Sequence, residues 1–230
     1  MSRYIVTGTN RGIGLEFVKQ LLAQGHDVLA TARDPETVPA LNELQHAHKQ
    51  LTLLPLDLSD ESSIARFARE AGAQPIDVLI NNAGVYGPRN ASLGSLRTDE
   101  WAEVMLIDLI APLMLTQALL PALRQGKDKR IAFLSSMMGS IADNSSGGAY
   151  IYRSAKAGLN QAVKSLAVDL SKENFIVLPL HPGWVQTDMG GPNAQIDTKT
   201  SVTGLLQRIQ NSTAGDSGKF LNYDGKTIAW

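Results

Sequence analysis

The strongest constraint on this chain is the alternation, along its whole length, of short apolar β-rich runs with longer helical patterns. Most of the short runs are apolar throughout, which is typical of strands covered on both faces of a sheet. The alternation of strand and helix favours right-handed crossover connections and a parallel sheet. We therefore predict an α/β fold with a doubly wound parallel sheet of about seven strands.

The expected elements follow one another without a break. We predict strands over residues 4–7, 28–31, 51–56, 78–80, 131–134, 175–180 and 220–222. We predict helices over residues 13–24, 40–47, 64–71, 98–124, 151–172 and 201–211. The breaker-rich stretch 190–194 is too short to be a domain boundary. The simplest organisation is one domain, residues 1–230, that carries both the cofactor site and the substrate site.

Charge and residue usage exclude several classes of function. The formal net charge is −1, so we expect no nucleic-acid-binding surface. The chain has no cysteine, and His46 and His48 lack a third ligand at a recognisable spacing, so we expect no metal site. The N-terminus lacks the apolar stretch of a signal peptide, and no apolar run approaches the roughly 18 residues that span a bilayer. We expect a cytoplasmic protein without a membrane partner.

Glycines follow the first predicted strand. The stretch Thr7–Gly14 reads T-G-T-N-R-G-I-G and leads directly into the first helix. Glycines at this place allow a sharp turn and a close approach of the backbone to a pyrophosphate. The helix N-terminus adds free N–H groups and a positive partial charge. A merely tight turn is the alternative. We predict that the loop binds a dinucleotide through Gly8, Asn10, Arg11, Gly12, Ile13 and Gly14.

The end of the second predicted strand indicates which dinucleotide binds. A site for NAD usually carries an acidic residue there, which holds the ribose hydroxyls. Here the strand ends in A-T-A-R, so Arg33 would meet a 2′-phosphate, and Arg11 could reach the same group. Asp34 argues in the other direction, because it could neutralise Arg33 or bind the ribose itself. The pattern favours NADP(H) as the cofactor.

A phenol and an ammonium share one face of the predicted helix 151–172. Tyr152 and Lys156 are four residues apart, which places them one turn apart. An ammonium roughly 5 Å away stabilises a phenolate by about 3 kcal/mol at an effective dielectric constant near 20, or roughly two pKa units. Such a tyrosine can exchange a proton with a substrate oxygen near neutral pH. Tyr150 lacks a lysine at this spacing, because Ser154 stands there.

Four motifs, in this order, resemble those of the short-chain dehydrogenase/reductase family. They are T-G-x-x-x-G-x-G at residues 7–14, N-N-A-G at 81–84, Y-x-x-x-K at 152–156 and P-G-x-V-x-T at 182–187. The resemblance implies a Rossmann-type sheet with the strand order 3-2-1-4-5-6-7. It also implies contacts with the cofactor at the ends of the third, fourth and sixth strands. The cofactor-binding residues that it adds are Asp57, Leu58, Asn82, Ala83, Gly84, Tyr152, Lys156, Pro182, Gly183, Val185 and Thr187.

The same resemblance implies the catalytic roles. Ser136, the second serine after the fifth strand, would polarise the substrate carbonyl, and Ser135 remains an alternative. The gap of 16 residues from Ser136 to Tyr152 is longer than the family usually has. Asp108 stands where the family has a catalytic asparagine, which helps to hold a water that links the lysine to solvent. An aspartate could still hold a water, but it adds charge near Lys156 and alters the proton relay.

These features together predict an enzyme that transfers a hydride between NADP(H) and a small carbonyl or alcohol. The longer gap and the segment 218–230 resemble the carbonyl-reductase and C-signal-like branch of the family. One alternative is an NADP(H)-binding signalling or regulatory protein with little catalysis. A nucleotide-sugar epimerase is another, although the short C-terminal region leaves little room for its substrate domain. The resemblance also implies a homodimer or homotetramer, paired through the helices 98–124 and 151–172.

Overall fold

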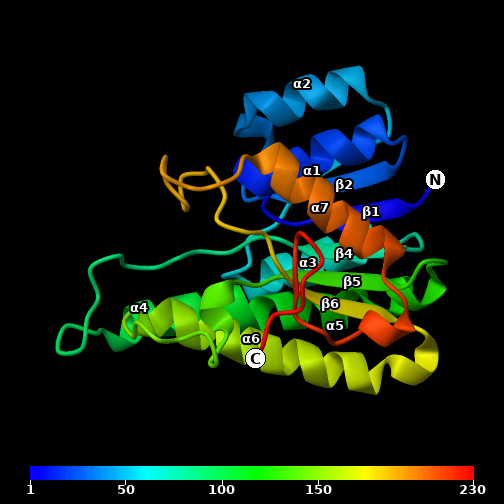
Figure 1. Ribbon diagram of the computed structural model, residues 1–230. Coiled ribbons are helices and arrows are strands. Elements are labelled where there is room, and N and C mark those ends of the chain that lie inside the picture. The colour runs from blue at the N-terminus through cyan, green and yellow to red at the C-terminus, as the bar shows by residue number, and fades with distance from the viewer.

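The computed structural model describes residues 1–230 and contains a seven-stranded parallel sheet with helices on both faces (Figure 1). The strand order is β3-β2-β1-β4-β5-β6-β7, which confirms the predicted fold class and topology. The strands are β1 (Arg3–Val6), β2 (Asp27–Ala32), β3 (Leu51–Pro55), β4 (Val78–Asn81), β5 (Arg130–Leu134), β6 (Ile176–His181) and β7 (Leu221–Asn222). The helices are α1 (Gly12–Ala23), α2 (Pro39–Ala47), α3 (Glu61–Ala71), α4 (Thr98–Met105), α5 (Ala111–Gln125), α6 (Tyr150–Asp169) and α7 (Thr198–Asn211).

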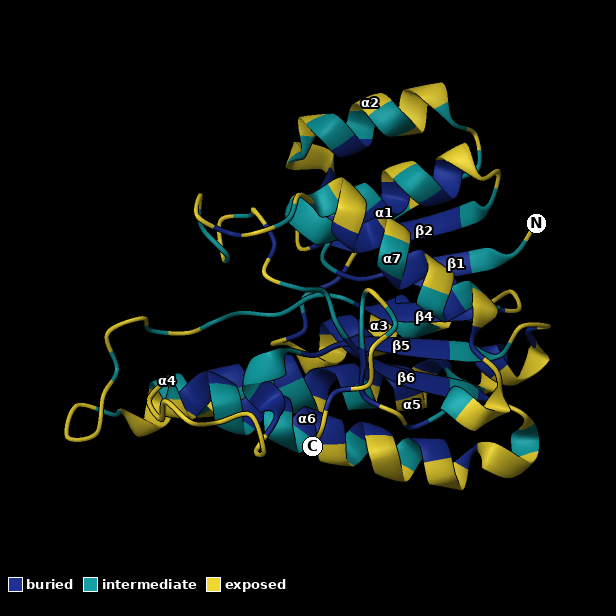
Figure 2. Cartoon of the chain, viewed as in Figure 1, coloured by how far each residue is buried: buried dark blue, intermediate teal, exposed yellow.

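Two apolar layers hold the helices against the sheet. Successive residues of β1 enter opposite layers: Ile5 joins the side covered by α3, α5 and α6, whereas Tyr4 and Val6 join the side covered by α1, α2 and α7. This is the two-residue period of a strand, and it explains why most strand positions, on both faces, are apolar. Figure 2 shows the strands buried and the outward faces of the helices exposed.

Helix boundaries differ from the predicted ones by at most three residues. Helix α7 begins three residues early because the Asp197 side chain caps it, accepting a hydrogen bond from Thr200 N–H at 2.7 Å. Asp60 caps α3 in the same way, at Ser62 N–H. Polar first turns of this kind have no apolar period, so a prediction from periodicity starts the helix too late.

One long helix contradicts the expectation that no segment is long and apolar enough to cross a membrane. Helices α4 and α5 join into a continuous helix over Thr98–Gln125, 28 residues long, with a mean hydropathy of 1.8 in its most apolar window. Leu115, Leu119 and Leu123 of this helix are fully buried in the core. A core helix meets the same length and composition criteria, so this helix alone does not indicate a membrane segment.

A π-helical turn, η2 (Leu106–Ile110), joins α4 to α5. Within it the N–H of Ala111 bonds to the carbonyl of Leu106, five residues earlier. The wider turn holds one more residue than an α-turn, and it turns Asp108 inward, where the side chain is fully buried. The sequence pattern predicted one uninterrupted helix here and did not indicate this turn.

Gly126 gives a direct test of the packing after α5. A Cβ at this position would lie 1.9 Å from the carbonyl oxygen of Ile76, so the backbone would have to move. We expect Gly126→Ala to lower the free energy of unfolding by roughly 2 kcal/mol, because overpacking of this kind strains the fold. Gly215→Ala is the control, since its Cβ would meet no atom closer than 3.6 Å. The measurement is the midpoint of thermal unfolding, and equal midpoints for the two variants would contradict this packing.

Candidate functional site

Three of the sequence motifs meet at the carboxyl edge of the sheet. The Asn82 side chain donates to the carbonyls of Thr7 and Gly8, at 2.8 and 3.1 Å, and so fastens the segment after β4 to the glycine loop. A Cβ on Gly8 would lie 2.8 Å from Cα of Ala83, so only glycine allows this approach. In the segment after β6, Thr187 Cγ2 would be 3.3 Å from a Cβ on Gly12. The glycine loop thus lies between the segments that follow β4 and β6.

The start of α1 is open to an anion. No side chain caps this helix, and the first backbone N–H with an acceptor in the chain is that of Leu15, which bonds to the carbonyl of Arg11. The N–H groups of Gly12, Ile13 and Gly14 are therefore free. Free N–H groups and the positive end of the helix dipole suit a phosphate. The residues of the glycine loop fit the pyrophosphate of a dinucleotide.

Arg33 lies at the end of β2 with no carboxylate within ion-pair distance, so Asp34 does not neutralise it. Asp57, after β3, accepts hydrogen bonds from the Ser59 hydroxyl and N–H. These bonds, with a smaller contribution from Arg33, lower the pKa of Asp57. Arg33 is consequently a free cation beside an ionised carboxylate, which suits a 2′-phosphate next to ribose hydroxyls.

Arg11 has a partner that the sequence did not indicate. Its guanidinium forms an ion pair with the carboxylate of Asp188, in the segment after β6. Both side chains are about 70% exposed, 70% for Arg11 and 71% for Asp188, so water screens the pair. For Arg11 to reach a 2′-phosphate, as the sequence suggested, it would have to leave Asp188.

The remaining predicted cofactor residues lie at the ends of β3 and β6. Leu58, in the segment after β3, is buried in the core. In the segment after β6, the Pro182 carbonyl accepts a hydrogen bond from Ser201 of α7 at 2.6 Å, and Gly183 has a positive φ of 85°. Val185 is buried and pairs with Ile196 in an isolated parallel bridge. These contacts fix the P-G-x-V-x-T segment against α7 and against Ile196.

Tyr152 and Lys156 share one face of α6, as their spacing predicted. The Lys156 ammonium lies 5.7 Å from the centre of the Tyr152 ring. It donates to the Leu134 carbonyl at 3.1 Å and forms an ion pair with Asp108 at 3.0 Å. The Lys156 side chain is 6% exposed and that of Asp108 is 0% exposed, so both charges are shielded from water.

The pKa of the Tyr152 phenol differs from the sequence-based expectation. Burial raises this pKa and Lys156 lowers it, but Asp108 raises it again, and the net result is a value above the usual one. The sequence-based expectation concerned the ammonium alone, and Lys156 does lower this pKa; burial and the Asp108 carboxylate, which that expectation left out, outweigh it. Burial also opposes the charge of Lys156, but Asp108 and Tyr152 outweigh burial and raise the pKa of that ammonium.

The two serines after β5 have separate surroundings. The Ser135 hydroxyl is buried and donates to the Asn160 side chain at 2.6 Å. Ser136 accepts a hydrogen bond from Met138 N–H at 3.2 Å, and its side chain also interacts with the Tyr152 phenol. Ser135 therefore serves the packing of β5 against α6, whereas Ser136 faces the phenol. This geometry favours Ser136 over the alternative that the sequence left open.

Asp108 contacts Lys156 directly. One carboxylate oxygen accepts a hydrogen bond from Val85 N–H at 2.7 Å, and the other faces the ammonium of Lys156. A Cβ on Gly84 would lie 3.2 Å from Asp108, so the N-N-A-G segment leaves room for this carboxylate. The expectation that Asp108 adds charge near Lys156 is confirmed by this ion pair.

Tyr86 is a site residue that the sequence did not indicate. Its ring lies 4.7 Å from that of Tyr152, centre to centre, at an interplanar angle of 31°. Tyr86 follows the N-N-A-G motif by two positions, which was the one available signal. An aromatic residue at that position lies at the carboxyl edge of the sheet, where ligands bind.

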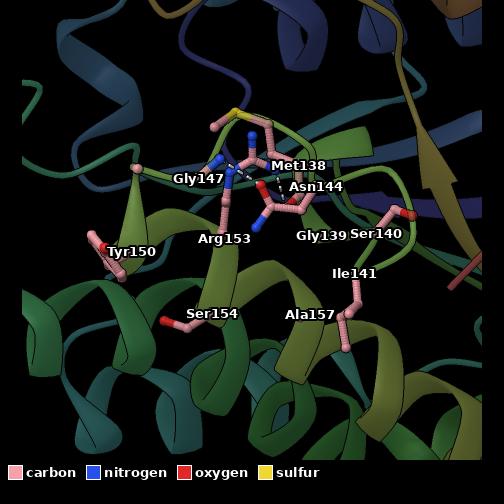
Figure 3. Close-up of a pocket in the computed structure, with 11 residues that line it drawn as sticks. Met138, Gly139, Ser140, Ile141, Asn144, Gly147, Tyr150, Arg153, Ser154 and Ala157 are labelled. Atoms are coloured by element: carbon pink, nitrogen blue, oxygen red, sulfur yellow. Dashed lines mark hydrogen bonds between the residues drawn. The ribbon is translucent and has the colours of Figure 1, made fainter.

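A separate pocket of about 250 Å³ lies between α6 and the segment after β5 (Figure 3). From α6 it is lined by Tyr150, Arg153, Ser154 and Ala157, which lie on a different face of the helix from Tyr152. Ser136, Tyr152 and Lys156 do not line it. This pocket is therefore distinct from the reactive residues.

Comparisons with known proteins agree with this geometry. The sequence profile described as short chain dehydrogenase matches residues 3–197. The C-signal protein of Myxococcus xanthus is 48% identical over 71% of this chain and 98% of its own length. The carbonyl reductase Sniffer of D. melanogaster is 35% identical, with a TM-score of 0.95 and 100% of both chains covered. The NADPH-bound carbonyl reductase from chicken fatty liver is 36% identical, with a TM-score of 0.93 over 100% of this chain and 99% of that one.

The Asp108 carboxylate gives a test of the electrostatics. Asp108→Asn keeps an acceptor for Val85 N–H and removes the negative charge. Because that charge raises the pKa of Tyr152, we expect the phenol to ionise at a lower pH in the variant. Ultraviolet absorbance of the phenolate, taken as the difference from a Tyr152→Phe background, measures this. Asp143→Asn, a change at an exposed residue, is the control and should not move the titration. A titration that moves to higher pH in Asp108→Asn would refute the arrangement.

Proposed function

The chain belongs to the short-chain dehydrogenase/reductase family, and we propose that it is an NADPH-dependent oxidoreductase that interconverts a carbonyl and an alcohol. The observation that carries this proposal is the group of Ser136, Tyr152 and Lys156, in which Tyr152 and Lys156 are buried. It lies at the same edge of the sheet as a loop built for a pyrophosphate. The reductases named above, one of them NADPH-bound, support the same activity.

The cofactor would lie along the carboxyl edge of the sheet. When bound, NADPH supplies a hydride from its nicotinamide ring, and the protein orients that ring against the substrate. The free N–H groups of α1 would hold the pyrophosphate, and Arg33 the 2′-phosphate. The residues that we assign to the cofactor are Gly8, Asn10, Arg11, Gly12, Ile13, Gly14, Arg33, Asp57, Leu58, Asn82, Ala83, Gly84, Tyr152, Lys156, Pro182, Gly183, Val185 and Thr187.

Ser136, Tyr152 and Lys156 would each have a separate role at the substrate oxygen. The Ser136 hydroxyl would donate a hydrogen bond to the carbonyl oxygen and so polarise it. Tyr152 would transfer its phenolic proton to that oxygen as the alkoxide forms. Lys156 would stabilise the phenolate that remains, and Asp108 would keep the ammonium in place.

The charge balance of the site decides whether Tyr152 holds its proton. Burial and Asp108 hold the pKa of Tyr152 above its usual value, so the phenol carries its proton at neutral pH. Reduction needs a protonated phenol, because the tyrosine acts as the acid. Oxidation of an alcohol needs the phenolate as the base, and that form is favoured only at higher pH.

A second function is an NADP(H)-binding signalling protein with little catalysis. The 48% identity to the C-signal protein of Myxococcus xanthus and the aspartate at position 108 both motivate it. The intact Ser136, Tyr152 and Lys156 support the enzyme instead, since a binding module does not need a phenol beside a buried ammonium. Turnover of NADPH with a panel of carbonyl substrates separates the two functions.

Removal of the proton donor is the direct test of the reaction. Tyr152→Phe should lower kcat for NADPH oxidation by roughly 10²- to 10⁴-fold with a panel of aldehydes, ketones and quinones. Tyr150→Phe is the matched control, and it should retain activity because Tyr150 lies on the pocket face of α6. If the unaltered protein binds NADPH but oxidises it with none of these substrates, the signalling function is favoured.

Arg33 is the test of cofactor choice. Arg33→Asp should reduce the ratio of kcat/KM with NADPH to that with NADH about 100-fold, because charge-assisted hydrogen bonds to the 2′-phosphate are lost. Arg69→Asp, on the exposed face of α3, makes the same charge change and should leave the ratio as it is. If Arg33→Asp keeps the same preference for NADPH over NADH, Arg33 does not bind the 2′-phosphate.

A further inference from the structure

The loop between β4 and α4 holds an aromatic ring against the reactive phenol. Tyr86 lies 4.7 Å from the Tyr152 ring and is half-buried. The Arg89 guanidinium lies 5.4 Å from the centre of the Tyr86 ring, within cation–π range. Two ring contacts therefore connect the guanidinium to the phenol.

Arg89 also joins two loops. It donates to the backbone carbonyls of Asp188 and Met189, at 3.2 and 2.8 Å, in the segment after β6. That segment begins at the predicted cofactor-binding residues Pro182 and Gly183, so Arg89 connects the loop after β4 to the loop after β6. The large apolar residues Met189 and Trp184 of the same segment are 39% and 50% exposed.

The charge of Arg89 is not neutralised. Its partners are carbonyls and an aromatic ring, and it forms no ion pair. The carboxylate of Asp188, the acidic group next to it, is already paired with Arg11. A free guanidinium, with donors left over and an aromatic ring beside it, is suited to an anionic group on an apolar molecule.

We propose that Arg89 is a specificity-determining residue that selects carbonyl substrates carrying a carboxylate away from the reacting carbon. The inference rests on the proposed function, and it names the substrate class: a planar or aromatic aldehyde or ketone with an anionic group at its far end. Arg89 would meet the carboxylate, and Tyr86, which contacts both the guanidinium and the phenol, would border the body of the substrate. Because this contact is remote from the reacting bond, it acts on substrate binding and so on KM.

A matched pair of aldehydes tests the assignment. 4-Formylbenzoate and methyl 4-formylbenzoate share the reacting group and the ring and differ in charge. The quantity measured is the ratio of kcat/KM for the acid to that for the ester, with NADPH. In the unaltered protein we expect the acid to be preferred about fivefold, chiefly through a lower KM, as one partly screened charge pair would give. The preference should fall in high salt, where the Debye length is short.

Three variants separate charge from structure. Arg89→Gln should bring the ratio close to that for a neutral site, Arg89→Lys should retain part of the preference, and Arg89→Glu should favour the ester. Arg97→Gln is the control, because Arg97 is exposed and paired with Asp99 on α4, and it should leave the ratio unchanged. Using the ratio cancels any general loss of activity from loosened loops.

Two results would overturn the role of Arg89. A ratio that stays the same in Arg89→Gln and Arg89→Glu, while both aldehydes are turned over, overturns the role of Arg89 and leaves the proposed reaction standing. A preference for the ester in the unaltered protein overturns it as well. Failure of the unaltered protein to reduce either aldehyde, or any other carbonyl, would overturn the proposed reaction and this inference with it.

Discussion

Lys156 carries its charge where almost no water reaches it, and the surroundings of the site are arranged around that charge. A buried ammonium is tolerated only when a counter-charge and hydrogen-bond acceptors replace its hydration. Asp108 supplies the counter-charge and the Leu134 carbonyl supplies an acceptor. Val85 N–H in turn holds the carboxylate of Asp108. The end of β5, the segment after β4, the π-turn and α6 must therefore keep their relative positions, or a buried charge loses its partner.

The parallel sheet makes this arrangement possible. All strands run in the same direction, so their carboxyl ends and the segments that follow them meet at one edge. Glycines then decide how closely those segments approach one another. A Cβ on Gly14 would lie 2.1 Å from the Gly8 carbonyl oxygen, and a Cβ on Gly139 would lie 2.8 Å from the Lys156 backbone. The first contact shapes the phosphate loop, and the second brings the segment after Ser136 against α6.

The fold and the reactive pair could be predicted because their signals are local and periodic. Apolar runs mark strands, and a spacing of four residues places Tyr152 and Lys156 on one helix face. The ion pair between Asp108 and Lys156 could not be predicted in the same way. It depends on a π-turn, which leaves no periodic signal in the sequence, so the residue was foreseen but its direct contact was not.

The contacts among the loops were harder still to foresee. Arg11 and Asp188, or Tyr86 and Tyr152, are far apart in the sequence and belong to segments without a period. Their pairing follows from where the strands end and from how tightly the glycines let the loops approach. A pattern along the chain identifies such residues as polar or aromatic loop positions, but the partner of each depends on the assembled sheet edge.

The buried and exposed charges of this site have different physical roles. Inside, the opposite charges of Lys156 and Asp108 largely cancel, so the ammonium no longer dominates the pKa of Tyr152, and burial keeps the phenol protonated. Water weakens charge interactions at the exposed loops, where Arg33 and Arg89 lie, so these arginines have little effect on the chemistry of the phenol. They can still meet charged groups on molecules that approach from solvent. In the proposed reaction the buried charges would therefore set the proton affinity of Tyr152, and the exposed charges on the loops would meet the charged groups of the molecules that bind.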